Sequence, residues 1–257
     1  MSNTTKHLFI TGAAQGIGRE TARLFAAQGW RVAVADRDAA GLASLAGELG
    51  SAACLPLTLD VTQPAQVAAA LSACGEWSGG RLDLLINNAG ILAMGPNRDL
   101  SLETQHRIVD VNLGGVLSAV HHALPLLRAT PGARILSVAS ASALYGIPEL
   151  AVYSATKAAL KSLTESLSLE LEPLGILVSD VLPPYVATGL LNGPGPQAAS
   201  VAKMGVSLTA GDVAQVLWQA AQGRRLHWFM TPKVKALNVI FNLFPFARRS
   251  LVKLLAT

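Results

Sequence analysis

A tyrosine and a lysine four residues apart, with a serine upstream, form the pattern best suited to chemistry in this chain. Tyr153 and Lys157 lie in the run Tyr-Ser-Ala-Thr-Lys, and Ser140 precedes the tyrosine by thirteen residues. On a helix, residues i and i+4 share one face, so the phenol and the ammonium lie side by side. Lowering the pKa of a tyrosine from about 10 to about 7 takes roughly 4 kcal/mol. A positive charge at about 4 Å supplies roughly that amount at an effective dielectric of about 20, so we expect Lys157 to make Tyr153 an acid and base near neutrality.

Two alternatives to this assignment of Tyr153, Lys157 and Ser140 stay open at this point. The pattern Tyr-x-x-x-Lys also occurs on ordinary amphipathic helices, where the tyrosine packs and the lysine is solvated. Ser140 also has rivals as the residue that binds the substrate oxygen, because Ser142 lies two residues farther on and Ser137 is a weaker candidate. The spacing to Tyr153 favours Ser140.

The N-terminal segment has the layout of a dinucleotide site. His7–Thr11 is typical of a short buried strand, and it leads into the glycine run Gly12–Gly18 and a helical pattern over Arg19–Gln28. Glycines let a pyrophosphate approach the backbone, and the N-terminus of the helix favours an anion. The spacing is Gly-x-x-x-Gly-x-Gly rather than Gly-x-Gly-x-x-Gly. A glycine turn that merely packs is the alternative, and the flanking strand and helix count against it.

An acidic residue follows the second expected strand and bears on the choice of cofactor. Asp36 comes directly after Arg31–Ala35 and lies twenty residues after Gly16. An acid at that distance commonly accepts the hydroxyls of the adenine ribose and repels a 2′-phosphate. Arg37 follows at once and is able to tolerate a phosphate, whereas the glycine loop carries Gln15 rather than a basic residue. We therefore expect NAD and keep NADP as the alternative.

Taken together, the motifs resemble the short-chain dehydrogenase/reductase family in its common short form. They occur in the order of that family and cover roughly residues 7 to 222. No single motif is decisive, but their joint occurrence is highly specific. The motifs that carry the resemblance are Thr11–Gly18, Asp60-Val61, Asn87–Gly90, Asn112, Ser140 and Tyr153-x-x-x-Lys157.

The resemblance implies a role for each matching position. Asp60 and Val61 hold the adenine, Lys157 also binds the nicotinamide ribose, and Asn112 supports a water in a proton relay. The family has a Pro-Gly pair before a threonine that meets the nicotinamide carboxamide, and here Pro184 replaces the glycine, which predicts a stiffer loop. The expected catalytic residues are Asn112, Ser140, Tyr153 and Lys157. The expected cofactor-binding residues are Gly12, Gln15, Gly16, Ile17, Gly18, Asp36, Arg37, Asp60, Val61, Asn88, Ala89, Gly90, Tyr153, Lys157, Pro183, Val186 and Thr188.

Strand-like and helix-like segments alternate along the chain. Leu82–Asn87 follows the helical stretch Ala65–Trp77, and Arg134–Ser140 follows Val116–Arg128. This alternation predicts crossover units and one parallel sheet, covered on both faces because its strands are uniformly apolar. We therefore expect an α/β fold, with a Rossmann-type doubly wound parallel sheet flanked by helices in a single domain over residues 1–257. It carries a small helical lid at about 185–208 and a basic, apolar C-terminal tail at about 224–257.

Composition narrows the class of protein further. An apolar content of 51% with 14% charged residues allows a large core and favours an oligomer. The resemblance implies a homodimer or homotetramer, formed by long helices around Ser101–Arg128 and Ala151–Glu172. Two cysteines without pattern argue against a disulfide framework or a metal site. The polar start at Met1–Lys6 and the absence of a long apolar stretch predict a cytoplasmic protein with no signal peptide and no spanning helix.

The expected substrate is a small hydrophobic secondary alcohol or its ketone. No arginine or lysine is clearly aimed at a substrate carboxylate, and the candidate wall residues are mostly apolar. These are Leu92, Met94, Leu144, Tyr145, Ile147, Tyr185, Leu190 and Leu191. An NAD(P)-dependent oxidoreductase with Tyr153 as acid and base is the preferred function. The alternatives are an NADPH-dependent reductase of a lipid or carrier-bound ketone and a non-catalytic scaffold that senses a dinucleotide.

The C-terminal segment departs most from the rest of the chain. From Arg224 to Thr257 there are seven Lys or Arg residues and no acid, out of 20 basic and 16 acidic residues in the chain. The segment also carries aromatic residues, so membrane-surface contact or partner binding is one interpretation. We rank it behind packing on the substrate pocket or on a neighbouring subunit. Pro245 breaks any single helix here. Nucleic-acid binding is not expected, because the preceding part is acidic and no recognition motif is present.

Overall fold

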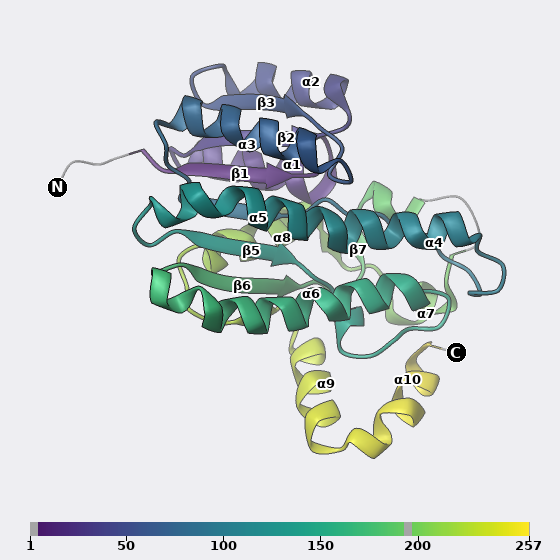
Figure 1. Cartoon of the computed structure of the whole chain (residues 1–257). Helices are drawn as coiled ribbons and strands as arrows, with labels where there is room; N and C mark the ends of the chain where they lie inside the picture. The colour runs from purple at the N-terminus through teal and green to yellow at the C-terminus, as the bar shows by residue number, and fades with distance from the viewer. Residues whose placement is uncertain (1–4, 193–196, 257) are drawn as a thin grey trace.

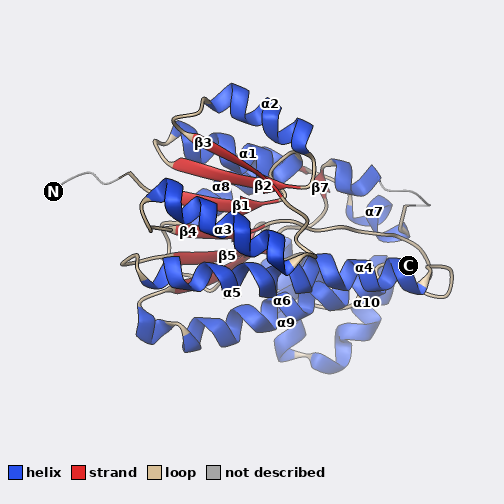
Figure 2. Cartoon of the chain, turned by 45° about the horizontal axis from the view of Figure 1, so that its top comes forward, coloured by secondary structure: helices blue, strands red, loops and turns tan. Residues whose placement is uncertain are grey.

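The computed structural model describes residues 5–192 and 197–256 as a parallel sheet with helices on both faces (Figure 1, Figure 2). In this part of the chain the large sheet has seven parallel strands in the order β3-β2-β1-β4-β5-β6-β9. Their bounds are β1 (His7–Thr11), β2 (Arg31–Asp36), β3 (Cys54–Thr58), β4 (Leu84–Asn87), β5 (Arg134–Val138), β6 (Leu177–Leu182) and β9 (His227–Phe229). The strand order reverses beside β1, so the expected doubly wound fold is confirmed. In such sheets ligands bind where the order reverses, outside the carboxyl ends of the strands.

Two sets of helices cover the sheet. One face carries α1 (Gly16–Ala27), α2 (Ala39–Leu49) and α8 (Ala210–Ala220), and the other carries α3 (Pro64–Ser78), α5 (Gly115–Arg128) and α6 (Ala151–Glu170). Helix α4 (Leu102–Val109) continues into α5 through one π-helical turn, η1 (Asp110–Gly114). Short 3₁₀ turns follow β5 and α6, at η2 (Ala141–Ala143) and η3 (Glu172–Leu174). The long helix expected around Ser101–Arg128 is therefore interrupted near its centre.

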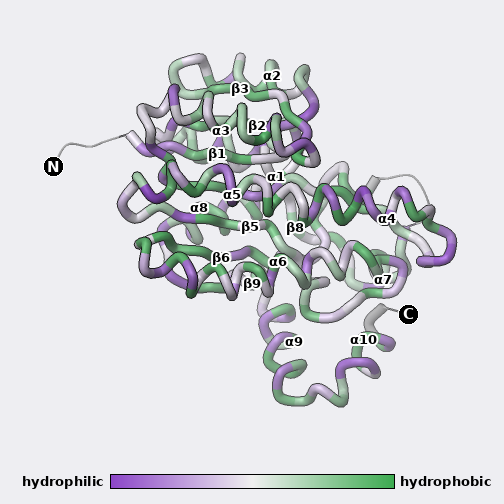
Figure 3. The backbone as a smooth tube through the Cα atoms, viewed as in Figure 1, coloured by the Kyte–Doolittle hydropathy of each residue, from purple (hydrophilic) through white to green (hydrophobic). Residues whose placement is uncertain are grey.

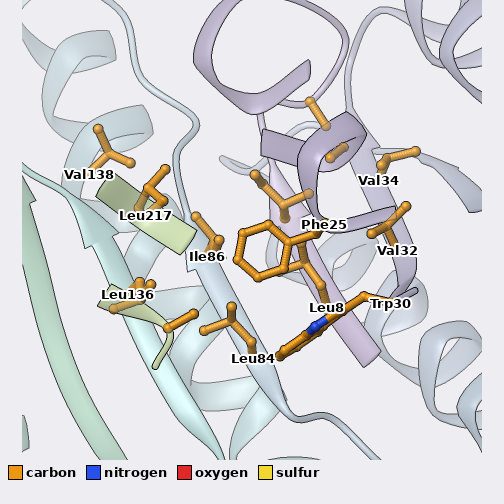
Figure 4. Packing of buried hydrophobic residues seen from close by; sticks show 14 of the residues in the cluster. Leu8, Phe25, Trp30, Val32, Val34, Leu84, Ile86, Leu136, Val138 and Leu217 are labelled. Atoms are coloured by element: carbon orange, nitrogen blue, oxygen red, sulfur yellow. The ribbon is translucent and has the colours of Figure 1, made fainter. Parts of the chain in front are cut away.

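Buried apolar side chains, among them Phe25 of α1 and Leu217 of α8, hold these two helices on their face of the sheet (Figure 4). The Phe25 ring meets Trp30 and Trp218 edge to face, with centroids 5.1 Å and 5.0 Å apart. Burying a phenylalanine contributes about 1.5–3 kcal/mol, and each aromatic pair adds about 0.5–1.5 kcal/mol. Helix α1 follows the glycine turn directly, so this packing also holds the turn against the sheet.

The ends of several elements differ from expectation in ways that matter for the site. Helix α1 begins at Gly16, three residues before the expected start at Arg19, because Gln15 is extended and serves as the N-cap. The N-terminus of the helix therefore lies inside the glycine turn. Strand β5 ends at Val138 rather than at Ser140, so Ser140 lies in the loop beyond the sheet.

The segment expected as a lid leaves the sheet after β6. It holds η4 (Gly189–Asn192), α7 (Ala199–Met204) and two short paired strands, β7 (Val186–Ala187) and β8 (Leu208–Thr209). Residues 193–196 of this segment lie outside the described residues. Glu149 accepts the amide of Ala199 at 2.8 Å, which ties the start of α7 to the loop before α6.

The C-terminal segment forms two helices that project from the body (Figure 1, Figure 3). Helix α9 (Pro232–Leu243) leads into a 3₁₀ turn, η5 (Pro245–Ala247), and then into α10 (Arg248–Ala256). The chain breaks at Pro245, as expected for a proline there, and α10 returns to pack on α7. Among the described residues, every helix is too short or too polar to cross a membrane.

Candidate active site

Tyr153 and Lys157 lie one turn apart near the start of α6, and both reach toward the end of β5. The Lys157 Nζ atom lies 5.6 Å from the centre of the Tyr153 ring. It donates a hydrogen bond of 2.8 Å to the carbonyl oxygen of Val138. Ser140 approaches the Tyr153 side chain from the loop that follows β5 and lowers the pKa of the phenol. The fold thus brings together three residues that the spacing singled out.

The competing serines occupy different places. Ser142 donates its backbone amide to Ser140 Oγ at 3.2 Å, and its hydroxyl has no hydrogen-bond partner among the described residues. Ser137 lies within the sheet and accepts a hydrogen bond of 3.4 Å from the side chain of Asn87. Of the three serines, Ser140 is the one that acts on the pKa of the tyrosine. The geometry therefore favours Ser140.

Burial dominates the electrostatics of the pair. It raises the pKa of Tyr153 to about 12, the hydrogen bond from Ser140 opposes this rise, and Tyr185 adds slightly to it. Burial also lowers the pKa of Lys157 to about 8. These protein groups alone do not bring the pKa of Tyr153 near 7, because the lysine bonds to Val138 and both side chains are desolvated.

Asn112 lies on the π-helical turn η1 and is fully buried. Its Oδ1 accepts the amide of Ile91 at 2.8 Å, and its Nδ2 donates to the Ile91 carbonyl at 3.0 Å. The same Nδ2 donates to Thr156 Oγ1 at 3.2 Å, and that hydroxyl donates to the Tyr153 carbonyl at 2.7 Å. Because both ends of its amide are bonded to protein, Asn112 ties the loop after β4 to the turn of α6 that carries the tyrosine.

The glycine turn packs closely against the loop after β4. Gly12 has φ +69°, and a Cβ there would come within 2.8 Å of the Cα of Ala89. A Cβ on Gly18 would lie 2.6 Å from Asn88 Nδ2 and closer still to the Gly12 carbonyl. That Nδ2 donates to the carbonyls of Thr11 and Gly12, both at 2.9 Å. Only glycine fits these two positions. The close packing places the N-terminus of α1 next to the loop after β4.

The far end of the site carries the two carboxylates that the sequence predicted. Asp36 accepts the amides of Ala14 at 3.0 Å and Asp38 at 3.1 Å, one on each oxygen. Asp60 accepts the amide and the hydroxyl of Thr62, and the backbone bond is the largest cause that lowers the pKa of Asp60. Both carboxylates are therefore held in fixed orientations at the ends of their strands.

One cavity of about 520 Å³ connects these parts. It runs from the glycine turn and the carboxylates to the tyrosine, and on to the C-terminal helices. Of the residues expected for the site, all line this cavity except Gly18, which supports the turn from behind, and Asn112, which is buried beside it.

Comparison with known proteins agrees with this arrangement. The family model described as short chain dehydrogenase matches residues 6–198. The chain belongs to the short-chain dehydrogenase family. It is thus an oxidoreductase of a family that acts on CH–OH groups with NAD or NADP. The matched range ends before α9 and α10, so the C-terminal helices lie outside it.

Relatives of this dehydrogenase differ in their substrates. Galactitol 2-dehydrogenase of Agrobacterium fabrum is 39% identical over 189 residues, covering 72% of each chain. A 3-alpha-(or 20-beta)-hydroxysteroid dehydrogenase of Mycobacterium tuberculosis is 39% identical over 184 residues, covering 71% of this chain and 70% of that protein. A crystal structure of a family member from Burkholderia phymatum in complex with NAD superposes with a TM-score of 0.86 at 28% identity, covering 96% of each chain.

The substrate end of the cavity has apolar walls. Seven of the eight expected wall residues line it, namely Leu92, Leu144, Tyr145, Ile147, Tyr185, Leu190 and Leu191. Met94 lies behind the wall instead, where its Sδ accepts the amide of Ala198 at 3.3 Å. The Tyr185 hydroxyl lies 2.6 Å from Ser200 Oγ, so this tyrosine is held by α7.

Several wall residues were missed at the sequence level. Val234, Leu237 and Phe241 of α9 line the cavity together with Val252 of α10. Their spacing of three and four residues marks one helix face, which was a usable signal. Arg107 also lines the cavity and had no pattern to single it out.

Proposed function

We propose that this short-chain dehydrogenase interconverts a hydrophobic secondary alcohol and its ketone, with NAD as the preferred cofactor and Tyr153 as acid and base. The observation that carries the proposal is the shared cavity. Ser140, Tyr153 and Lys157 line the same space as the glycine turn, and the remaining wall is apolar. A scaffold that only senses a dinucleotide has no need for a serine bonded to a tyrosine at that place.

The residues of the glycine turn fit a dinucleotide. Gly12 and Gly18 pack with no room for a Cβ, so no side chain separates a ligand from the backbone at the first turn of α1. The amides of that turn and the helix dipole favour a pyrophosphate. Asp60 and Val61 would hold the adenine, while Asn88, Ala89 and Gly90 would line the path to the nicotinamide. When bound, the nicotinamide supplies the position that accepts or donates hydride.

The choice between NAD and NADP rests on one strand end. Asp36 is fixed by two backbone amides and lines the cavity, and a carboxylate there favours ribose hydroxyls over a phosphate. Arg37 also lines the cavity and is the observation that keeps the NADPH-dependent alternative open. Dissociation constants for the two cofactors decide the matter, and tighter binding of NADP would reverse the preference.

Side chains of the protein transfer the proton and stabilise the charge on the substrate oxygen. In oxidation, the Tyr153 phenolate takes the proton of the substrate hydroxyl while hydride leaves the carbinol carbon, and in reduction the tyrosine returns that proton. Ser140 binds the substrate oxygen and stabilises the charge that grows on it. With a pKa raised to about 12 by burial, Tyr153 needs positive charge nearby to ionise. Lys157 supplies part of it, and Asn112 holds the turn of α6 in place.

The substrate class follows from the walls of the cavity. Apolar side chains from the lid segment and from α9 surround the space beyond the tyrosine. Such walls favour an apolar ring or chain over a polyol. The expected substrate is therefore closer to the steroid named for the mycobacterial relative than to the galactitol named for the Agrobacterium relative. A panel of apolar secondary alcohols and ketones, followed by absorbance of the reduced nicotinamide with each cofactor, tests the proposal. Turnover of polyols alone would contradict it.

The assembly is also a proposal. Exposed leucines lie on the outer helices, namely Leu102 on α4, Leu117 on α5 and Leu169 on α6. A helical face of this kind suits contact with a second copy, so we infer a homodimer or homotetramer of a single-domain protein in the cytoplasm. Light scattering after size-exclusion chromatography measures the assembly, and a monomer at micromolar concentration would contradict it.

A further inference from the structure

Helix α9 has two apolar faces, and the body of the protein covers one of them. Val234, Leu237 and Phe241 face inward and line the cavity. At 100° per residue, Val239 and Leu243 fall on the opposite side and Ile240 lies at its edge, and all three are exposed. A helix of a soluble protein normally has one apolar stripe, so the outer stripe calls for a partner.

The exposed apolar surface continues around the turn between the two helices. The side chains of Leu243 and Phe246 are 66% and 82% exposed, and Phe244 lies between them with its ring packed edge to face on Phe246. Leu254 on α10 is exposed as well. In Figure 1 this end of the hairpin projects away from the sheet, so it is free to approach a flat surface.

Positive charges flank this apolar surface. Lys233 and Lys235 lie on either side of the outer stripe of α9, and Arg249 is exposed on α10. All 16 acidic residues of the chain lie before residue 224, whereas seven of its 20 basic residues lie at or after it. The segment from residue 224 onward is therefore positively charged, whereas the body, with 13 basic and 16 acidic residues, is negatively charged.

We propose that the C-terminal hairpin (residues 232–256) docks on the surface of an anionic lipid bilayer. The aromatic turn, Phe244 and Phe246, enters the interfacial layer together with Leu243. The lysine and arginine side chains meet the anionic head groups, and their aliphatic stems cover apolar surface. Each basic side chain near such a surface strengthens binding about fivefold.

A second copy of the chain is a poorer occupant of this surface. Pairing across a two-fold axis places the same patch on both sides, so a segment with seven basic residues and no acid would face its own positive charge. Like charges facing each other across an interface weaken it, whereas a layer of anionic lipid neutralises them. The charge pattern therefore selects the bilayer.

Docking at this end also fits the position of the cavity. The inner face of α9 lines the substrate end of the cavity, and its outer face meets the bilayer. One helix therefore separates the cavity from a bilayer in which an apolar substrate dissolves. The docking proposal nevertheless stands on the exposed surface alone and does not depend on the chemistry at Tyr153.

Flotation with vesicles tests the proposal on the full chain. We expect the protein to float with phosphatidylcholine vesicles that contain phosphatidylserine, to stay behind with phosphatidylcholine alone, and to be released by added salt. Phe246→Ser should weaken binding roughly tenfold. Arg249→Gln, at an exposed position just after the aromatic turn, should weaken it about fivefold. Leu174→Ser, which removes an exposed leucine from the body, should float like the wild type.

Thermal unfolding and dinucleotide affinity should be the same in all four proteins, since the substituted side chains are exposed and lie outside the cavity. Equal flotation of the wild type and Phe246→Ser, or equal flotation with and without phosphatidylserine, would overturn the proposal. A wild type that never floats but forms a dimer lost in Phe246→Ser would overturn it in favour of a second copy on this surface.

Discussion

The Lys157 Nζ atom donates to the carbonyl oxygen of Val138 at 2.8 Å, although it lies on the same helix face as Tyr153. This bond anchors the ammonium at the end of β5 and sets its distance from the phenol, 5.6 Å to the ring centre. We therefore expect the lysine to act on the tyrosine through space. Its effect depends on its charge, and burial brings the pKa of Lys157 down to about 8.

Removing this charge should shift the pH dependence of alcohol oxidation. At 5.6 Å and an effective dielectric of about 20, a unit charge favours the phenolate by roughly 3 kcal/mol. This corresponds to about two pKa units. In Lys157→Met the limb of kcat/KM that rises with pH should therefore move about two units toward alkaline pH, because phenolate forms less readily without the cation. An unmoved limb with a merely lower maximum would show that the lysine only positions the cofactor.

Replacing the phenol should separate chemistry from binding. Tyr153→Phe keeps the ring in place but removes the proton donor and acceptor, so we expect kcat to fall about 10²- to 10⁴-fold. Fluorescence titration should give a nearly unchanged dissociation constant for the dinucleotide. Tyr185→Phe, at a cavity tyrosine bonded to Ser200 rather than to Ser140, is the control and should retain most turnover. Comparable losses in both variants would argue against Tyr153 as the acid and base.

The parts of the site that were predictable from sequence are those set by short spacing. The i, i+4 relation of Tyr153 and Lys157 depends only on a helix forming there, and α6 forms over that stretch. The glycine turn follows equally from a strand, glycines and a helix in immediate succession. Asp36 was predictable because a carboxylate at the end of β2 reaches the carboxyl edge of the sheet in any doubly wound fold.

Features set by packing between distant segments were not predictable. The π-helical turn Asp110–Gly114 sets the position of Asn112. The local sequence gives no propensity that would predict this turn. The raised pKa of Tyr153 depends on burial that appears only in the folded chain. The spacing of Val234, Leu237 and Phe241 marked one apolar helix face but not what that face covers, because the same spacing suits contact with a second subunit.

The glycine turn allows a direct test of close packing. Gly18→Ala places a methyl group against the Gly12 carbonyl and Asn88, so the turn must open and the dinucleotide should bind at least tenfold more weakly. Gly47 makes a matched control, because it also lies in a helix and a Cβ there meets no atom within 4 Å. Gly47→Ala should leave affinity unchanged and stabilise the fold by about 0.5–1 kcal/mol. Equal effects of the two variants on affinity would contradict the close packing.

Both cysteines should be unreactive in the folded protein. Burial raises the pKa of Cys54 to about 11 and that of Cys74 to about 12. The thiolate is the reactive form, so at pH 8 only about one thiol in a thousand or fewer is ionised in the native state. Reaction with Ellman's reagent should be negligible at pH 8 and should reach two thiols per chain in denaturant. Rapid labelling of the native protein would contradict the burial of these two side chains.

The wall contributed by α9 should set the preference for apolar substrates. Phe241 is buried against Leu144 and Tyr145 and lines the cavity, so Phe241→Ala opens space that a small apolar alcohol cannot fill. We expect KM for such an alcohol to rise about tenfold, the equivalent of roughly 1.4 kcal/mol of lost contact, while kcat changes little because Tyr153 is untouched. A bulkier alcohol should lose less. Phe246→Ala, at an exposed position on the same hairpin, should leave both constants unchanged for substrates in solution. If Phe241→Ala left KM unchanged for small and bulky alcohols alike, α9 would not form part of the substrate wall.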